Sequence, residues 1–229
     1  MIPLRDTIPS KRLPVLTWVL IAANIVVFAW ELSLGATNAG SALTYAFVPA
    51  RFFARHPGGL GAVQPFFPLV SSMFLHGGWL HLVGHMLYLF IFGDNVEDAL
   101  GHVSYALFYL LCGVVAALAQ AFAAPHSTVP MIGASGAIAG VLGAYFVLYP
   151  GARVLTLVPF FVFFQILEVP AFFFLLFWFL LQFASGALSI GSAAALQGGV
   201  AWWAHVGGFA TGLLVALAVR VGRAVSRGF

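Results

Sequence analysis

Long apolar stretches that lack charged residues are the feature that most limits what this chain can fold into. The sequence has 229 residues, of which 62% are hydrophobic and 7% are charged, and its mean hydropathy is +1.06. A soluble domain carries roughly a quarter charged residues, so the composition excludes a soluble globular fold. A helix needs about 20 largely apolar residues to cross a bilayer. We therefore predict an all-α integral membrane bundle that forms one domain.

Six stretches have the apolar character of membrane-spanning helices. They are approximately Leu13–Leu34, Trp79–Phe92 with the apolar stretch before it, Tyr105–Ala123, Val129–Tyr149, Phe172–Phe183 and Trp202–Val219. The residues Val154–Val169 precede Pro170, which favours a break, and we interpret them as an interfacial or re-entrant connection. Two separate spans from this run would each be short. The predicted organisation is a cytoplasmic segment 1–12, a six-span membrane domain 13–221 and a cytoplasmic tail 222–229.

The distribution of basic residues supports six spans with both termini in the cytoplasm. Cytoplasmic loops of membrane proteins carry an excess of Lys and Arg. Six spans place two basic residues outside, Arg51 and Arg55, and seven inside: Arg5, Lys11, Arg12, Arg153, Arg220, Arg223 and Arg227. Seven spans would move the last three arginines outside. Because the basic residues stand singly at the edges of apolar runs, they indicate topology, and no nucleic-acid partner is expected.

This topology brings three reactive side chains to the same depth in the membrane. The second, fourth and sixth spans all run from outside to inside, so their N-terminal ends share the outer leaflet. His81 follows Trp79, Ser135 lies near the start of the fourth span, and His205 follows Trp202. Tryptophan favours the membrane interface. We therefore expect the serine and both histidines just below the outer surface.

Glycine spacing indicates which spans approach each other closely. The fourth span carries Gly133, Gly136, Gly140 and Gly143, and the sixth carries Gly208 and Gly212. Small residues four apart allow helix backbones to pack closely in lipid. If these two spans meet, the Ser135 hydroxyl and the His205 imidazole can meet as well. Taken alone, the glycine pattern is equally consistent with a purely structural packing motif.

Three histidines around the second span favour a functional site. His76, His81 and His85 are spaced five and four residues apart, and ionisable residues inside a span usually mark function. Neutral structural histidines and a zinc site bound by His81 and His85 are the alternatives. The H-E-x-x-H pattern of a zinc protease is absent from the sequence, and acidic residues are lacking near this pair. We expect no metal and no cofactor.

Four motifs together resemble the rhomboid family of intramembrane serine proteases. Met73-Phe-Leu-His-Gly-Gly-Trp-Leu-His81 and Phe92-Gly-Asp-Asn-Val-Glu-Asp98 are similar to the family's second span and the loop after it. Met131-Ile-Gly-Ala-Ser-Gly136 is similar to its G-x-S-G signature. Trp203-Ala-His-Val-Gly-Gly208 is similar to its histidine-bearing span.

The resemblance implies a Ser–His dyad, with Ser135 as the nucleophile and His205 as the general base. It also implies that His81 donates to the oxyanion. The backbone N–H groups at the start of the fourth span, at Ser135, lack intrahelical partners and can hold the same oxyanion, with Gly133 and Gly136 in supporting positions. Where the family commonly has an asparagine, four residues after His81, this sequence has His85. A histidine can also donate one N–H, so we expect His85 to take over that role.

The expected function is therefore that of a serine endopeptidase that cleaves transmembrane segments of membrane proteins. Its partners would be these substrates and the lipid bilayer. We expect it to be a multi-pass protein of a bacterial plasma membrane. A catalytically weak or silent rhomboid-like protein that binds transmembrane clients is the alternative. A histidine-lined transporter would be expected to show inverted repeats, and the sequence shows no such symmetry.

Overall fold

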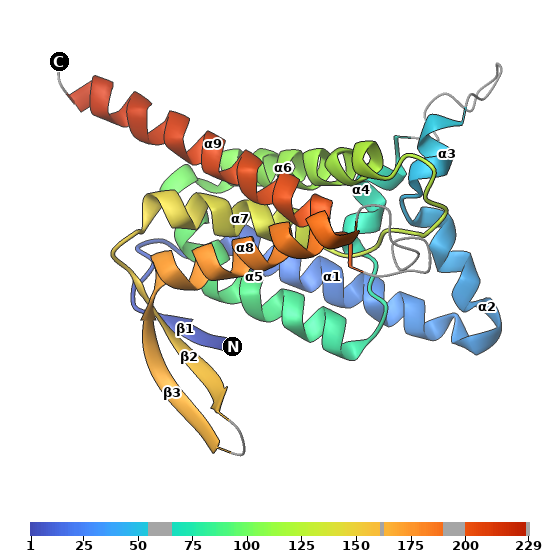
Figure 1. Cartoon of the computed structure of the whole chain (residues 1–229), viewed down its shortest axis with the longest axis horizontal. Helices are drawn as coiled ribbons and strands as arrows, with labels where there is room; N and C mark the ends of the chain where they lie inside the picture. Colours follow the sequence, from blue (N-terminus) through green and yellow to red (C-terminus); the bar gives the residue numbers. More distant parts are fainter. Residues whose placement is uncertain (55–65, 161–162, 190–199, 228–229) are drawn as a thin grey trace.

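The structure is a computed structural model that describes residues 1–54, 66–160, 163–189 and 200–227. It confirms a predominantly helical bundle (Figure 1). The long helices are α1 (Val15–Ser33), α5 (Trp79–Leu100), α6 (His102–Ala123), α7 (Ser135–Leu148), α8 (Ala171–Ser189) and α9 (Trp202–Arg227). Shorter helices occupy the connection between α1 and α5: α2 (Gly35–Ala42), α3 (Pro49–Phe53) and α4 (Pro68–Ser71), with 3₁₀ turns at Leu43–Tyr45 and Ser72–Phe74.

Four helices, α1, α6, α8 and α9, are long and apolar enough to cross a membrane. A fifth crossing is possible if α5 is counted with the bent segment before it, Pro68–Phe74, which meets it at 97°. These helices show that the protein is a multi-pass membrane protein. The remaining apolar helix, α7, has 14 residues. At a rise of 1.5 Å per residue it is about 21 Å long, which is shorter than the roughly 30 Å hydrocarbon core.

The short helix α7 lies at the centre of the bundle. Every residue from Gly136 to Tyr145 is buried, as expected for a helix that is apolar on all sides. Its N-terminus therefore begins inside the protein, next to buried Ala134, whereas residues 124–130 earlier in the loop are half-buried or exposed. Irregular backbone at membrane depth is tolerated where protein surrounds it. The first residue of this helix is Ser135.

Glycines set the distance between α7 and its neighbours. A Cβ atom built on Gly143 would lie 2.9 Å from the carbonyl carbon of Phe209, and one on Gly212 would lie 2.6 Å from the carbonyl carbon of Gly140. A Cβ on Gly208 would lie 3.0 Å from the carbonyl carbon of Gly136. The backbones of α7 and α9 are therefore in direct contact, as the spacing predicted. The Cβ directions of Gly136 and Gly140 also face α6, at Ala116 and Cys112.

A three-stranded antiparallel sheet at one end of the bundle was not expected from the sequence. Its strands are β1 (Ile2–Asp6), β2 (Arg153–Phe160) and β3 (Phe163–Pro170), in the order β1-β2-β3. The segment Val154–Val169, interpreted as an interfacial or re-entrant connection, is thus a hairpin in which Val154 pairs with Val169. The residues 2–6 form the third strand by pairing with the part of β2 nearest the bundle.

Most of the basic residues predicted to be cytoplasmic gather at this same end. Arg220 donates a hydrogen bond to the carbonyl of Val147 at the end of α7, and Arg223 donates one to the carbonyl of Ala99 at the end of α5. Arg5 and Arg153 lie on the sheet. Arg51 lies on α3, at the opposite end of the molecule (Figure 1). Arg55 lies outside the described residues.

Glu97 ties α5 to the start of α1 at the sheet end. Its carboxylate accepts hydrogen bonds from the backbone N–H groups of Leu16 and Thr17, at 2.8 and 2.7 Å, and from the Thr17 hydroxyl. These are N–H groups of the first helical turn, which have no partner within the helix. His102 contacts the same carboxylate at 2.5 Å. A side chain of α5 thus caps a helix that is 80 residues away in sequence.

Candidate active site

The start of α7 presents a serine hydroxyl beside unpaired backbone donors. Ser135 is the first residue of α7 and is half-buried. The N–H groups of a first helical turn lack intrahelical acceptors and carry the positive end of the helix dipole. Gly133, two residues earlier, has φ +112°, a left-handed conformation that glycine adopts without strain. The local sequence thus places a half-buried hydroxyl next to groups that can bind negative charge.

His205 faces this region from the first turn of α9. It is 8% exposed, and α9 packs on α7 through the glycines described above. A Cβ on Gly136, the residue after Ser135, would lie 3.8 Å from the carbonyl oxygen of Ala204, the residue before His205. The two predicted partners therefore lie on adjoining turns. The Ser135 hydroxyl makes no hydrogen bond within the described part of the chain; catalytic hydrogen bonds are often long before substrate binds.

Gln182 of α8 determines which nitrogen of His205 is basic. The Nδ1 atom of His205 lies 2.7 Å from Oε1 of Gln182, and both side chains are buried. An amide oxygen only accepts, so Nδ1 carries the proton and Nε2 keeps its lone pair. Trp178, one turn earlier on α8, lies against the same imidazole at a centroid distance of 5.8 Å, with the two rings tilted by 35°. The imidazole of His205 is thus contacted by an amide oxygen and an indole ring.

Gln182 was not among the site residues predicted from the sequence. The available signal was a polar residue near the end of the apolar run Phe172–Phe183, since intramembrane polar groups usually have a partner. Only the tertiary structure shows that this partner is His205.

The histidines of the second span form one cluster. The ring centroids of His81 and His85 are 4.2 Å apart, and those of His76 lie 5.2 and 5.0 Å from them. Both His81 and His85 face Gly133, because a Cβ there would lie 2.9 Å from Nε2 of His81 and 2.8 Å from Cε1 of His85. A side chain at Gly133 would therefore collide with both rings. The predicted site residues of α5 and of the loop before α7 thus meet.

Hydrogen bonds assign the protons of these three rings. The carbonyl of Phe74 accepts from Nδ1 of His76 at 3.2 Å, which leaves Nε2 of His76 as an acceptor for Nδ1–H of His85 at 2.9 Å. The Nε2 atom of neutral His85 then has no proton. In contrast, Nδ1 of His81 accepts from the backbone N–H of Gly77 at 3.3 Å, so its proton resides on Nε2, the atom that faces Gly133.

Two further observations concern the zinc alternative that was raised from the sequence. Within the described ranges, no group of three or more His, Cys, Asp or Glu side chains is arranged to hold a metal ion. The Nε2 atom of His76 and Nδ1 of His85 face each other at hydrogen-bonding distance. Nδ1–H of His85 donates a hydrogen bond to Nε2 of His76, so this lone pair of His76 is already engaged.

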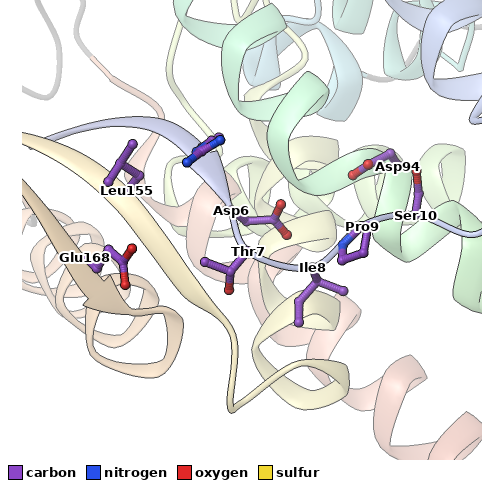
Figure 2. Close-up of a pocket in the computed structure, with 9 residues that line it drawn as sticks. Asp6, Thr7, Ile8, Pro9, Ser10, Asp94, Leu155 and Glu168 are labelled. Atoms are coloured by element: carbon purple, nitrogen blue, oxygen red, sulfur yellow. The ribbon is translucent and has the colours of Figure 1, made fainter.

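A separate cavity lies at the sheet end, away from the start of α7. It has a volume of about 580 Å³ and is open between β1, the following residues and the hairpin (Figure 2). Its lining includes Asp6, Asp94 and Glu168. The Asp6 carboxylate accepts hydrogen bonds from the Tyr145 hydroxyl at 2.5 Å and from Nδ2 of Asn95 at 2.9 Å. Asp6 thus fastens the N-terminal strand to α5 and α7.

Comparisons with known proteins identify the family. Residues 64–221 match the model of the Rhomboid domain. The chain is 32% identical over 132 residues to Rhomboid protease GluP of Bacillus subtilis, which covers 57% of this chain and 24% of that relative. It is 29% identical over 154 residues to RHOMBOID-like protein 4 of Arabidopsis thaliana, covering 64% of this chain and 32% of the relative. It is 34% identical over 76 residues to RHOMBOID-like protein 5 of the same plant, covering 33% and 25%.

The matched region therefore spans about a quarter to a third of the length of these relatives. The match to the domain model covers more than half of this chain, including α5, both histidine-bearing segments and the start of α7. This chain belongs to the rhomboid family of membrane proteins.

Proposed function

We propose that this protein is a serine endopeptidase that cleaves transmembrane segments of other membrane proteins. The observation that carries the proposal is the direct packing of α7, which begins at Ser135, on α9, which carries a buried imidazole, His205, with Nδ1 2.7 Å from Oε1 of Gln182. A serine hydroxyl is a weak nucleophile and needs an adjacent base. The lone pair on Nε2 of His205 is available for that task.

In this mechanism, Nε2 of His205 accepts the proton of Ser135 as the hydroxyl oxygen attacks the scissile carbonyl carbon. The resulting imidazolium donates that proton to the leaving amine, and the acyl group stays on Ser135. A water molecule, deprotonated by His205, then releases the acyl group. Gln182 keeps the ring in the required tautomer throughout, the role that a buried aspartate has in the serine protease triad.

The oxyanion would be held by His81 and by the backbone N–H of Ser135. Nε2–H of His81 faces the backbone at Gly133, and the first-turn N–H of α7 has no intrahelical acceptor. The proton that His85 could offer is directed at His76. We therefore assign His81 the principal ring contact to the oxyanion. His85, which stands where the family commonly has an asparagine, instead supports the positions of His81 and His76.

The basic residues that cluster at the sheet end of the bundle support a six-span chain with both termini in the cytoplasm. In that orientation α7 is the short fourth of six crossings and opens to the outer leaflet, and Ser135 lies just below the outer surface. We further propose a bacterial plasma membrane as its location, a setting supported by the Bacillus relative. The orientation would be tested by introducing single cysteines at Lys11 and at Arg51 and labelling them with an impermeant maleimide. Only the cysteine at position 51 should react from the outside.

The catalytic proposal is tested by a fluorophosphonate probe applied to the full chain in detergent. Wild-type protein should be labelled, Ser135→Ala should not, and His205→Ala should be labelled far more slowly because the hydroxyl loses its base. Ser33→Ala is a matched control, since this serine lies at the exposed end of α1 and bonds only to the carbonyl of Trp30. It should label as wild type does.

Cleavage of a transmembrane reporter in proteoliposomes should follow the same order. Folded wild-type protein that binds the reporter but neither cleaves it nor reacts with the probe would contradict the proposal. That outcome would instead favour a silent, client-binding rhomboid-like protein.

A further inference from the structure

The β2–β3 hairpin carries an apolar surface that the bundle does not cover. On β3, Phe163 is 69% exposed, Phe164 is 71% exposed and Ile166 is 58% exposed. Successive side chains of a strand point to opposite faces, so both faces of the outer hairpin are apolar. Exposed apolar patches of this kind mark an interaction surface.

The outer part of the hairpin also lacks support from the rest of the sheet. Strand β1 pairs with β2 only from Val154 to Leu157, where Val154 and Thr156 are buried. Beyond this point, β2 and β3 pair only with each other within the described residues. An isolated two-stranded hairpin is marginally stable in water. The apolar outer part therefore needs an environment that covers it.

The direction of the hairpin indicates what that environment is. Figure 1 shows it leaving the bundle where α7 ends and α8 begins, and running across the helix axes instead of along them. Because the long helices lie along the membrane normal, the hairpin runs roughly parallel to the membrane surface. Strand β3 continues directly into α8, whose Phe173 and Phe177 are 62% and 52% exposed on the outside of the bundle. The apolar surface of the hairpin is thus continuous with a lipid-facing helix.

Charge at this end of the molecule is complementary to a lipid surface. Arg5 and Arg153 have exposed side chains on the sheet at the base of the hairpin, where Arg153 lies 3.9 Å from the carboxylate of Glu168. Basic residues at a membrane surface attract anionic headgroups. The unpaired edge of β3 also limits the depth of insertion. Unsatisfied backbone groups are costly in hydrocarbon but can be hydrated among headgroups.

We propose that the β2–β3 hairpin lies in the headgroup region of the adjacent leaflet and inserts Phe163, Phe164 and Ile166 among the acyl chains. A fluid bilayer can enclose both apolar faces, whereas a protein docked on one face would leave the other in water. A second copy paired along the edge of β3 would leave both faces uncovered. The hairpin would anchor the end of α8 to the membrane surface.

The test uses the full chain in liposomes of phosphatidylcholine and phosphatidylglycerol, with an environment-sensitive fluorophore on Phe164→Cys. Lys11→Cys is the comparison site, because it is exposed at the same end but off the hairpin. Unsubstituted protein is the blank, since Cys112 is buried. Fluorescence should be blue-shifted at position 164 and quenched by lipids that carry a spin label near the headgroup. Aqueous iodide should quench it several-fold less than at position 11.

Two results would overturn the proposal. Equal iodide quenching at both positions, without quenching by spin-labelled lipid, would place the hairpin in water. Protection that disappears as the protein is diluted with lipid would show that a second copy covers it. As a further check, the fluorophore on Leu167→Cys should lose lipid quenching when Phe164 and Ile166 are both replaced by serine. These exposed side chains make no core contact, so that variant should remain folded.

Discussion

The contact between Gly212 and Gly140 offers the sharpest test of how packing supports catalysis. A Cβ atom at Gly212 would lie 2.6 Å from the carbonyl carbon of Gly140 and 2.8 Å from its Cα atom. Carbon atoms in contact are about 3.5–4.0 Å apart, so Gly212→Ala requires a separation of about 1 Å. The colliding atoms are backbone atoms of α7, which cannot rotate away. The helices α7 and α9 must therefore move apart.

Two opposing terms set the expected change in stability. Overpacking costs about 1–3 kcal/mol, and the rigid backbone contact favours the upper part of that range. Alanine regains about 1 kcal/mol over glycine inside a helix. We expect a net loss of about 1–2 kcal/mol in the free energy of unfolding, measured by circular dichroism during titration with SDS in mixed micelles.

Activity should fall further than stability does. Gly212 lies two turns after His205, about 10 Å along the helix axis, so a shift of α9 also displaces the imidazole relative to Ser135. A displacement of 1 Å can cost about 10²-fold in rate. Gly222→Ala is the matched control, because it lies on the same helix and its Cβ would have no atom within 4 Å. If Gly212→Ala and Gly222→Ala behave alike in both assays, the packing argument is refuted.

Three further predictions concern the site and the N-terminal strand. Gln182→Leu should lower kcat by about 10- to 100-fold with little change in KM. Gln182→Glu keeps an acceptor for Nδ1–H of His205 and should retain most activity. An equal loss of kcat in the two variants would refute an orienting role for Gln182. His81→Ala should lower kcat by about 10²–10³-fold, which is the cost of losing one oxyanion donor, and His85→Leu should lower kcat less. If His85→Leu lowers kcat more than His81→Ala in cleavage assays, His85 is the oxyanion donor. Burial raises the pKa of Asp6 above its unfolded value, although the hydrogen bond from Tyr145 opposes this. Folding then favours the protonated carboxyl of Asp6. Its contribution to the free energy of unfolding is therefore fully present below the pKa of Asp6 in the unfolded chain, and it is lost as pH rises through the pKa of Asp6 in the folded protein. Asp6→Asn should flatten that part of the stability profile, and an unchanged profile would contradict the assignment.

The sequence determined the helical bundle and the location of the candidate site. Apolar runs with few charges require helices, because only hydrogen-bonded backbone is tolerated in hydrocarbon. The glycine spacing in α7 and α9 correctly predicted close packing, since it depends on positions within each helix. The adjacency of the Gly133–Gly136 segment, His81 and the start of α9 followed from the alternating direction of the spans.

Tertiary structure alone decided the features that depend on distant partners. The apolar run Val154–Val169 carries no clear preference between strand and membrane segment, and its pairing with residues 2–6 fixes it as a hairpin. The proton position of His85 depends on its contact with His76. The proton position of His205 depends on Gln182, which lies 23 residues from it in the sequence. Periodicity within one segment reports which face is buried, whereas hydrogen bonds between segments depend on the assembled fold.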